Sequence, residues 1–306
     1  MYEGCVTSVK CAAGSTEGFT VKVGLHQGSA LSPFLFAMIM DELTGDIRKE
    51  APWSMLFADD VVLCSENRKE LEQDLERWRY ALERRGMRVS RSKTEYLCLN
   101  DIDNGEVKME GVDIKKVTEF RYLGSTVTST AESKTEVSKR ILSGWNGWRK
   151  VTGVLCDRNM DREIKGKVFR TCVRPCMLYG METVTMTKSQ EKKMEVAEMK
   201  MLRFTLGKTM RDRVRNVDIR KSLGVVRFGE KAREWRLRWF GHVRRRDDTY
   251  VGQRVLDMKP PGKRGRGRPR RRFMDSIRED MQELGLEEEE VQDLSGWRSA
   301  IRCGDP

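Results

Sequence analysis

Two consecutive aspartates, Asp59 and Asp60, interrupt an otherwise largely apolar stretch between residues 54 and 64. Successive residues of a straight strand face opposite sides, so neighbouring carboxylates converge only where the chain turns. The pattern therefore predicts a β-hairpin over residues 54–64 with both carboxylates at its tip. Aspartate is common in ordinary turns, but clustered carboxylates are also the ligands that Mg²⁺ prefers.

A glycine-bounded loop at residues 24–28 precedes the first helical pattern. Its glycines let backbone approach a ligand closely, and the amide of Gln27 can hydrogen-bond a base or a sugar edge. A helix is expected from about residue 32 to residue 49, with Ser32 as N-cap and Pro33 in its first turn. Because its first half is apolar on most sides, we expect this helix to be buried.

Periodicity separates a strand-containing part of the chain from a helical part. Residues 67–85 predict an amphipathic helix that ends at Gly86, because apolar side chains recur there at spacings of four, three and four. After residue 129 the strand pattern is lost, and most of residues 131–210 predict helices. The strands expected outside the aspartate hairpin lie at residues 5–10, 19–23, 96–99, 107–109 and 120–123.

These elements together predict an α+β fold in three parts. Residues 1–130 would form a domain built on an antiparallel sheet, and residues 131–250 an all-α region. Residues 251–306 would form a basic C-terminal extension, rich in Arg, Gly and Pro, that ends in a short helix around residues 272–284.

Basic residues are concentrated in the C-terminal half of the chain. The 306 residues carry a net charge of +12, whereas residues 203–272 alone hold 24 Lys and Arg against 7 Asp and Glu, a local +17. Such a balance favours a nucleic acid as partner over a membrane. The most apolar stretch, residues 33–40, is too short to span a bilayer, and the N-terminus lacks the apolar core of a secretory signal. We expect an intracellular protein, nuclear or cytoplasmic, without a membrane partner.

Residues 263–272 contain a Gly-Arg-Pro core that resembles an AT-hook, whose arginines enter narrow minor grooves. A disordered basic linker or a nuclear-import signal would have the same composition, and we favour unspecific contact with nucleic acid. The candidate contacts are Lys263, Arg264, Arg266, Arg268, Arg270, Arg271 and Arg272. Upstream, Trp235, Trp239 and Phe240 lie among arginines. Base stacking is one interpretation, but tryptophans four apart on a helix favour a role in the core.

Four motifs, in one order and at compatible spacing, resemble those of reverse transcriptases from LINE-type (non-LTR) retrotransposons. Motif C is the metal-binding hairpin of that family, and motif E is its primer grip. In chain order, motifs B, C, D and E correspond to residues 24–36, 57–60, 86–94 and 120–124. Residues 236–243 and 265–269 are similar to the C-terminal region of the same elements. The resemblance covers essentially the whole chain, as a partial palm, a helical thumb and a C-terminal extension.

The resemblance implies RNA-directed DNA synthesis, a nucleotidyltransferase reaction that uses an RNA template, a DNA primer, dNTPs and Mg²⁺. Asp59 and Asp60 would hold the metal, with Asp59 the more direct ligand, and Lys93 would protonate the leaving group. The substrate-binding residues would be Gln27, Gly28 and Ser29 of motif B and Tyr122, Leu123 and Gly124 of motif E. Lys93 has an ordinary alternative as a solvated surface lysine, and Tyr122 one as a core tyrosine.

The sequence departs from the family at motif A, which carries a further metal-binding aspartate on a strand ahead of motif B. The acids before motif B are Glu3 and Glu17, and neither lies in an apolar strand that leads into a helix. We therefore expect a truncated polymerase, without motif A and the fingers, that is inactive alone. Two alternatives stay open: a non-enzymatic nucleic-acid-binding protein and a decayed retroelement fragment without function.

Overall fold

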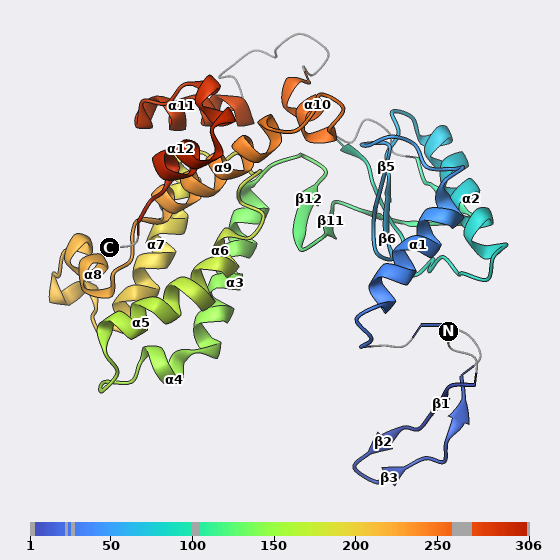
Figure 1. Ribbon diagram of the computed structural model, residues 1–306, viewed down its shortest axis with the longest axis horizontal. Coiled ribbons are helices and arrows are strands. Elements are labelled where there is room, and N and C mark those ends of the chain that lie inside the picture. Colours follow the sequence, from blue (N-terminus) through green and yellow to red (C-terminus); the bar gives the residue numbers. More distant parts are fainter. Residues whose placement is uncertain (1–3, 22–23, 26–27, 100–104, 259–270, 305–306) are drawn as a thin grey trace. The chain divides into compact units, whose positions relative to one another are not determined.

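The computed structural model describes residues 4–21, 24–25, 28–99, 105–258 and 271–304. The chain forms two compact units, Met1–Val117 and Thr118–Pro306 (Figure 1). Small two-stranded sheets and two long helices make up the first unit, and helices dominate the second. The predicted α+β class is confirmed. The three-part division at residues 130 and 250 stays a prediction. In the structure, residues 118–130 belong to the second unit together with the helices.

The N-terminal residues form two nested antiparallel ladders. β1 (Val6–Thr7) pairs with β4 (Phe19–Thr20), and between them β2 (Lys10–Cys11) pairs with β3 (Gly14–Ser15). The first strand expected here, residues 5–10, is divided into β1 and the start of β2, and β4 forms within the second, residues 19–23, whereas β3 lies outside both expected strands.

The first helix, α1 (Ser32–Thr44), differs from its prediction at both ends. Leu31 holds the N-cap position, no side chain caps the helix there, and Ser32 is already helical. The Ser29 hydroxyl instead accepts a hydrogen bond from the backbone N–H of Leu31, at 3.3 Å. The helix ends five residues earlier than expected.

The predicted burial of α1 is wrong for one of its faces. Met40 is buried against α2 and the aspartate hairpin, but Phe34 and Met38 are 64% and 54% exposed. A helix buries only the faces that its neighbours cover, and an apolar pattern does not say which faces those are.

The second helix, α2 (Arg68–Glu83), agrees with its prediction. Asn67 caps it by accepting a hydrogen bond from the N–H of Glu70 at 2.8 Å. Trp78 and Leu82 of the predicted apolar face are buried. Gly86, at φ +86°, follows its C-terminus in a left-handed conformation that glycine adopts without strain.

The rest of the first unit is a small sheet region packed on α2. β8 (Lys108–Met109) and β9 (Val112–Asp113) form a hairpin, and β7 (Glu95–Leu97) pairs with β10 (Lys115–Val117). The β7–β10 pair is parallel, which corrects the expectation of a purely antiparallel sheet. The long connection between these two strands provides the crossover that parallel pairing needs.

The second unit begins with the hairpin of β11 (Glu119–Tyr122) and β12 (Ser125–Thr128) and continues as helices, as predicted. The long helices are α3 (Lys134–Lys150), α7 (Lys188–Thr205), α9 (Phe228–Arg244) and α11 (Phe273–Leu284). Shorter helices are α4 (Thr152–Leu155), α5 (Arg162–Val168), α6 (Arg174–Leu178), α8 (Asn216–Leu223), α10 (Val251–Asp257) and α12 (Leu294–Ile301). A π-helical segment (Phe169–Val173) joins α5 to α6, and single 3₁₀ turns cover Met210–Asp212 and Glu288–Gln292.

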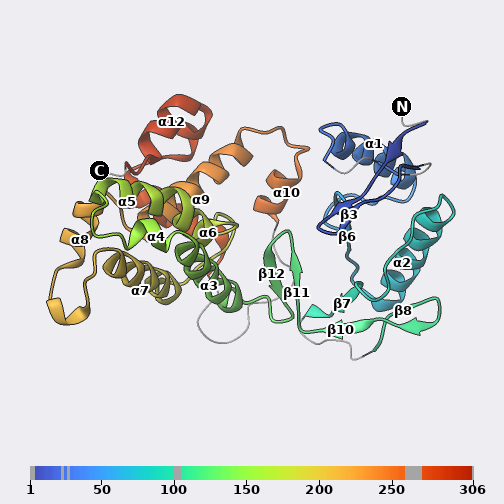
Figure 2. The same ribbon diagram turned by 90° about the horizontal axis from the view of Figure 1, so that it is seen from below.

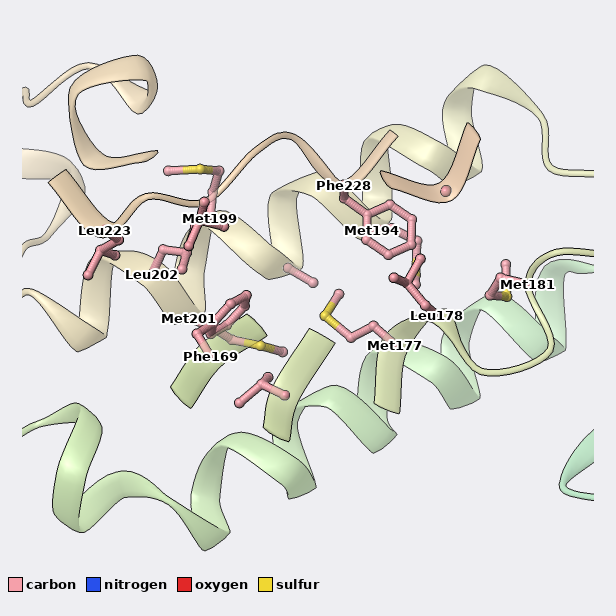
Figure 3. Packing of buried hydrophobic residues seen from close by; sticks show 14 of the residues in the cluster. Phe169, Met177, Leu178, Met181, Met194, Met199, Met201, Leu202, Leu223 and Phe228 are labelled. Atoms are coloured by element: carbon pink, nitrogen blue, oxygen red, sulfur yellow. The ribbon is translucent and has the colours of Figure 1, made fainter. Parts of the chain in front are cut away.

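Two cores hold this unit together. In the larger one, methionines and leucines of α6 and α7 pack against Phe169 and Phe228 (Figure 3). In the smaller one, α9 packs against α11 and α12. Trp297 of α12 is buried there and donates its indole N–H to the carbonyl of Leu237 at 3.2 Å. The predicted helix around residues 272–284 is confirmed as α11, and it is part of this core.

A close approach between two helices gives a sharp stability prediction. Gly166 of α5 lies against the end of α8, where an added Cβ would meet the backbone carbonyl oxygen of Leu223 at 1.7 Å. Gly166→Ala must therefore displace backbone, and we expect the free energy of unfolding to fall by about 3 kcal/mol. Gly153→Ala is the matched control, because nothing lies within 4 Å of its added Cβ. The control should be neutral or slightly stabilising. Urea unfolding measures both, and equal effects would contradict the packing.

Within the described part of the chain, helices of sufficient length and apolarity to cross a membrane are absent.

Candidate functional site

The aspartate hairpin is formed as predicted. β5 (Ser54–Phe57) and β6 (Asp60–Leu63) pair in an antiparallel register that sets Phe57 opposite Asp60. Leu56, Val61 and Leu63 lie on one face and pack against α1 and α2. Because side chains alternate along a strand, Phe57 and Asp60 lie on the other face.

The base of this hairpin is fixed to α2. The Ser54 hydroxyl accepts a hydrogen bond from the N–H of Lys49 at 2.9 Å and donates one to its carbonyl at 2.5 Å. The Lys49 ammonium contacts the Asp74 carboxylate of α2 at 2.5 Å, and that hydrogen bond is the main reason that the pKa of Lys49 is raised. The strands are therefore held at one end, and the tip projects from the other.

The tip itself is a two-residue turn of Ala58 and Asp59, with Ala58 in the left-handed region at φ +52°. Asp59 and Asp60 are both exposed. Phe57, also exposed at 61%, flanks the acids on the open face. The sequence placed Phe57 in motif C but assigned no separate role to its side chain. Strand alternation could have indicated that Phe57 is exposed, because it places Phe57 on the face opposite the apolar side chain of Leu56.

Two adjacent exposed carboxylates match the donor set of Mg²⁺, which keeps several waters and takes one or two carboxylates together with substrate phosphates. Among the described residues no group of three or more His, Cys, Asp or Glu side chains is placed to hold a metal ion. The tip thus presents two carboxylates that are not part of a larger group of metal-ligating side chains among the described residues.

The other predicted residues of the first unit that the structure describes lie on loops. Gly28 is exposed at φ +85° with open space around its α-carbon, so backbone is accessible there. Ser29 is half-buried, and its hydroxyl orders the turn before α1. Lys93 is exposed in a turn closed by the hydrogen bond from Thr94 N–H to the Ser90 carbonyl, at 3.0 Å. Gln27 lies outside the described residues.

The motif E residues form the tip of the β11–β12 hairpin in the second unit. Tyr122 ends β11, and Leu123 and Gly124 make the turn with φ values of +46° and +80°. A left-handed leucine is strained, so other contacts must hold the turn. A Cβ added at Gly124 would meet the Tyr179 ring at 3.1 Å, so the ring would have to move slightly to admit a side chain.

Three side chains missed by sequence reasoning hold this turn. The Tyr179 hydroxyl donates to the Leu123 carbonyl at 2.8 Å, and the Arg140 guanidinium donates to the Gly124 carbonyl. Glu136, buried beside Arg140 on α3, accepts from the N–H of Thr126 at 2.8 Å. The only signal in the sequence was the i, i+4 spacing of Glu136 and Arg140, which is common on exposed helices.

The basic residues of segment 203–272 form less of the exposed surface than the composition suggested. Arg203 is buried and donates to the carbonyl of Val214, and Arg236 forms a buried ion pair with Asp280 at 2.6 Å. Arg220 pairs with Glu198. The local +17 is therefore partly neutralised inside the fold by acids outside the segment. Other arginines there that form ion pairs are Arg215, Arg227, Arg233, Arg238 and Arg244.

Of the seven candidate nucleic-acid contacts at residues 263–272, the structure describes Arg271 and Arg272. Arg271 contacts Glu279 at 2.8 Å and Ser276 at 2.9 Å, so it secures the start of α11. Arg272 is exposed. Lys263, Arg264, Arg266, Arg268 and Arg270 lie outside the described residues.

The aromatic residues of α9 belong to the cores, as favoured above. Phe240 is fully buried. Trp239 packs edge-on against Phe273 with ring centroids 5.3 Å apart, and Trp235 packs against the larger core. Base stacking is wrong for Phe240 and is not supported for the tryptophans.

Comparison with known proteins finds one family model and several relatives. Residues 2–127 match the family model described as reverse transcriptase (RNA-dependent DNA polymerase). An uncharacterised transposon-derived protein of Caenorhabditis elegans is 25% identical over 268 residues, which cover 81% of this chain and 95% of that protein. No solved structure matches.

Two further relatives are named as Pol polyproteins of type-1 retrotransposable elements R2. The one from Popillia japonica is 24% identical over 59% of this chain and 32% of its own length. The one from Nasonia vitripennis is 34% identical over 30% of this chain and 10% of its own length. The chain therefore spans a third or less of these polyproteins.

Proposed function

We propose that this chain supplies part of the active site of the RNA-directed DNA polymerase of a non-LTR retrotransposon, because residues 2–127 match the reverse transcriptase family model and two relatives are named as Pol polyproteins of R2 retrotransposable elements. The observation that carries the proposal is the β5–β6 hairpin, which presents Asp59 and Asp60 in solvent on a base packed against two helices. Its partners would be an RNA template, a DNA primer and dNTPs, inside the cell, in the nucleus or the cytoplasm.

Each motif residue has a role in this proposal. Asp59 and Asp60 hold Mg²⁺, with Asp59 in the turn as the more direct ligand. Gln27, Gly28 and Ser29 line the nucleotide and template pocket, where Gly28 offers bare backbone. Lys93 protonates the pyrophosphate leaving group. When bound, Mg²⁺ would neutralise charge on the phosphates and activate the attacking 3′-hydroxyl.

The motif E hairpin acts as the primer grip in this proposal. Its turn is held by Arg140 and Tyr179, so Leu123, 38% exposed, is presented on a strained but supported backbone. Tyr122 supports the primer from the end of β11. A rigid grip is what positioning a primer terminus requires, since small displacements of a reacting group cost large factors in rate.

We further infer that these 306 residues provide two of the acids that catalysis needs and not the third. Glu17 is exposed in the loop between β3 and β4, not in a strand beside the hairpin. A polypeptide of these residues alone would then bind metal weakly and extend no primer.

Metal binding at the tip is testable without activity. When Mn²⁺ is titrated into the ¹⁵N-labelled chain, we expect paramagnetic broadening of the amide signals of residues 57–61, reversed by excess Mg²⁺. The Asp59→Asn/Asp60→Asn variant should lose it. Asp247 and Asp248 are a matched pair, because they are also consecutive and exposed, but Thr249 occupies the Asp247 carboxylate. Equal broadening at residues 247–248, or none at 57–61, would contradict a metal site at the hairpin.

A further inference from the structure

A groove between α3 and α7 in the second unit has a lining that the polymerase motifs do not explain. The two helices lie side by side (Figure 2), and the open groove that they line has a volume of about 480 Å³. Ile141, Val196 and Ala197 supply apolar walls. The polar lining consists of Trp145, Ser189, Lys192, Lys193 and Lys200.

Every polar side chain in this lining can donate a hydrogen bond, and no carboxylate is among the described residues that form it. Lys192, Lys193 and Lys200 are exposed. Unlike the arginines of α9, none of the three forms a hydrogen bond or ion pair with another residue that the structure describes. Unpaired ammonium groups around an apolar floor favour a ligand that is both anionic and partly apolar.

The groove continues into an exposed aromatic platform. Residues 189, 193, 196, 200 and 204 recur at spacings of four, three, four and four, so they share one face of α7. Phe204 is 51% exposed, and its ring centroid lies 6.0 Å from that of Trp145 and 6.2 Å from that of Trp148. The indole N–H of Trp148 is satisfied by Thr205 at 3.2 Å, which fixes the cluster.

We propose that this groove binds an unpaired nucleic acid strand, with phosphates on Lys192, Lys193 and Lys200 and a base against Phe204 and Trp145. Single strands are bound by this combination of a cationic track and an aromatic surface, and a base must be unpaired to stack. The proposal rests on the proposed function only in expecting a nucleic acid as partner. An acidic peptide would meet the same charges but would gain nothing from the aromatic rings.

The test is fluorescence anisotropy with labelled 12-nucleotide single strands, DNA and RNA, and with a 12-base-pair duplex, without metal or dNTP. Replacing Lys192, Lys193 and Lys200 with Gln should lower single-strand affinity on the order of a hundredfold at 0.1 M salt. It should also reduce the log–log salt slope by about 2, since roughly 0.7 counterions are released per phosphate. Duplex affinity should fall much less.

A matched variant removes the same charge elsewhere: Arg211, Arg213 and Lys221 are exposed cations of this unit, and replacing them with Gln should change single-strand affinity only a few-fold. Phe204→Leu keeps an apolar side chain but loses the ring, and should weaken single-strand binding about tenfold without weakening competition by polyglutamate. Thermal unfolding confirms that each variant folds.

Equal losses in the two triple variants, an unchanged affinity in Phe204→Leu, or polyglutamate binding as tightly as the oligonucleotide would each overturn the proposal. Single-strand binding is measured without metal or dNTP, whereas the hairpin is tested by Mn²⁺ broadening at residues 57–61. The groove and the catalytic hairpin can therefore fail separately.

Discussion

Replacing Glu198 with alanine should lower the free energy of unfolding of the second unit by about 3–5 kcal/mol. Glu198 is completely buried on α7. One of its carboxylate oxygens contacts Arg174 at 2.7 Å and the other contacts Arg220 at 2.6 Å. Both arginines also donate to the carbonyl of Val226. Without the carboxylate, two neighbouring guanidinium groups lose the negative charge between them, and a buried charge that loses its ion-pair partner is strongly destabilising.

The matched control is Glu195→Ala, one turn earlier on the same helix. Glu195 pairs with Arg227 at 2.9 Å, but the Arg227 side chain is largely exposed. An ion pair with one largely exposed partner contributes about 0–1 kcal/mol, so this variant should be far less destabilising than Glu198→Ala. Urea unfolding followed by circular dichroism gives both values. If the two variants differ by less than 1 kcal/mol, the buried triad is not what holds α6, α7 and α8 together.

The elements that could be predicted from sequence are those whose signal is local. The amphipathic face of α2 follows from Leu71, Leu75, Trp78 and Leu82, and those residues bury it in the structure. The β5–β6 hairpin follows from two apolar runs that only a turn can place side by side. In both cases the pattern lies within twenty positions, although the residues that pack against it lie farther along the chain.

What could not be predicted depends on partners far along the chain. The burial of α1 needed knowledge of which neighbours cover it, and Phe34 is exposed because α2 and the hairpin cover another face. Arg236 looked like part of a cationic surface, but its partner Asp280 lies 44 residues away. The support of the motif E turn by Tyr179 spans 56 residues. Composition gives the number of such charges, but it does not show whether each one is exposed or buried against a distant partner.

Asp59→Asn should abolish polymerisation in a polypeptide that is otherwise complete. For this test, the fingers and the motif A strand of a matching R2 polyprotein are fused ahead of residues 1–306. The loss of one metal-holding carboxylate removes several kcal/mol of transition-state stabilisation, so the rate of dNTP incorporation should fall roughly a thousandfold. Asp113→Asn, on the exposed β9 strand, is the control and should leave the rate unchanged.

Primer extension on an RNA template with Mg²⁺ is the most direct test of the central claim, that this chain carries the carboxylate hairpin of a reverse transcriptase but not a complete set of catalytic acids. We predict no extension by residues 1–306 alone, extension by the completed polypeptide, and loss of that extension in Asp59→Asn. Robust extension by residues 1–306 alone would contradict the missing acid. Undiminished extension by the Asp59→Asn form of the completed polypeptide would contradict the role of the hairpin.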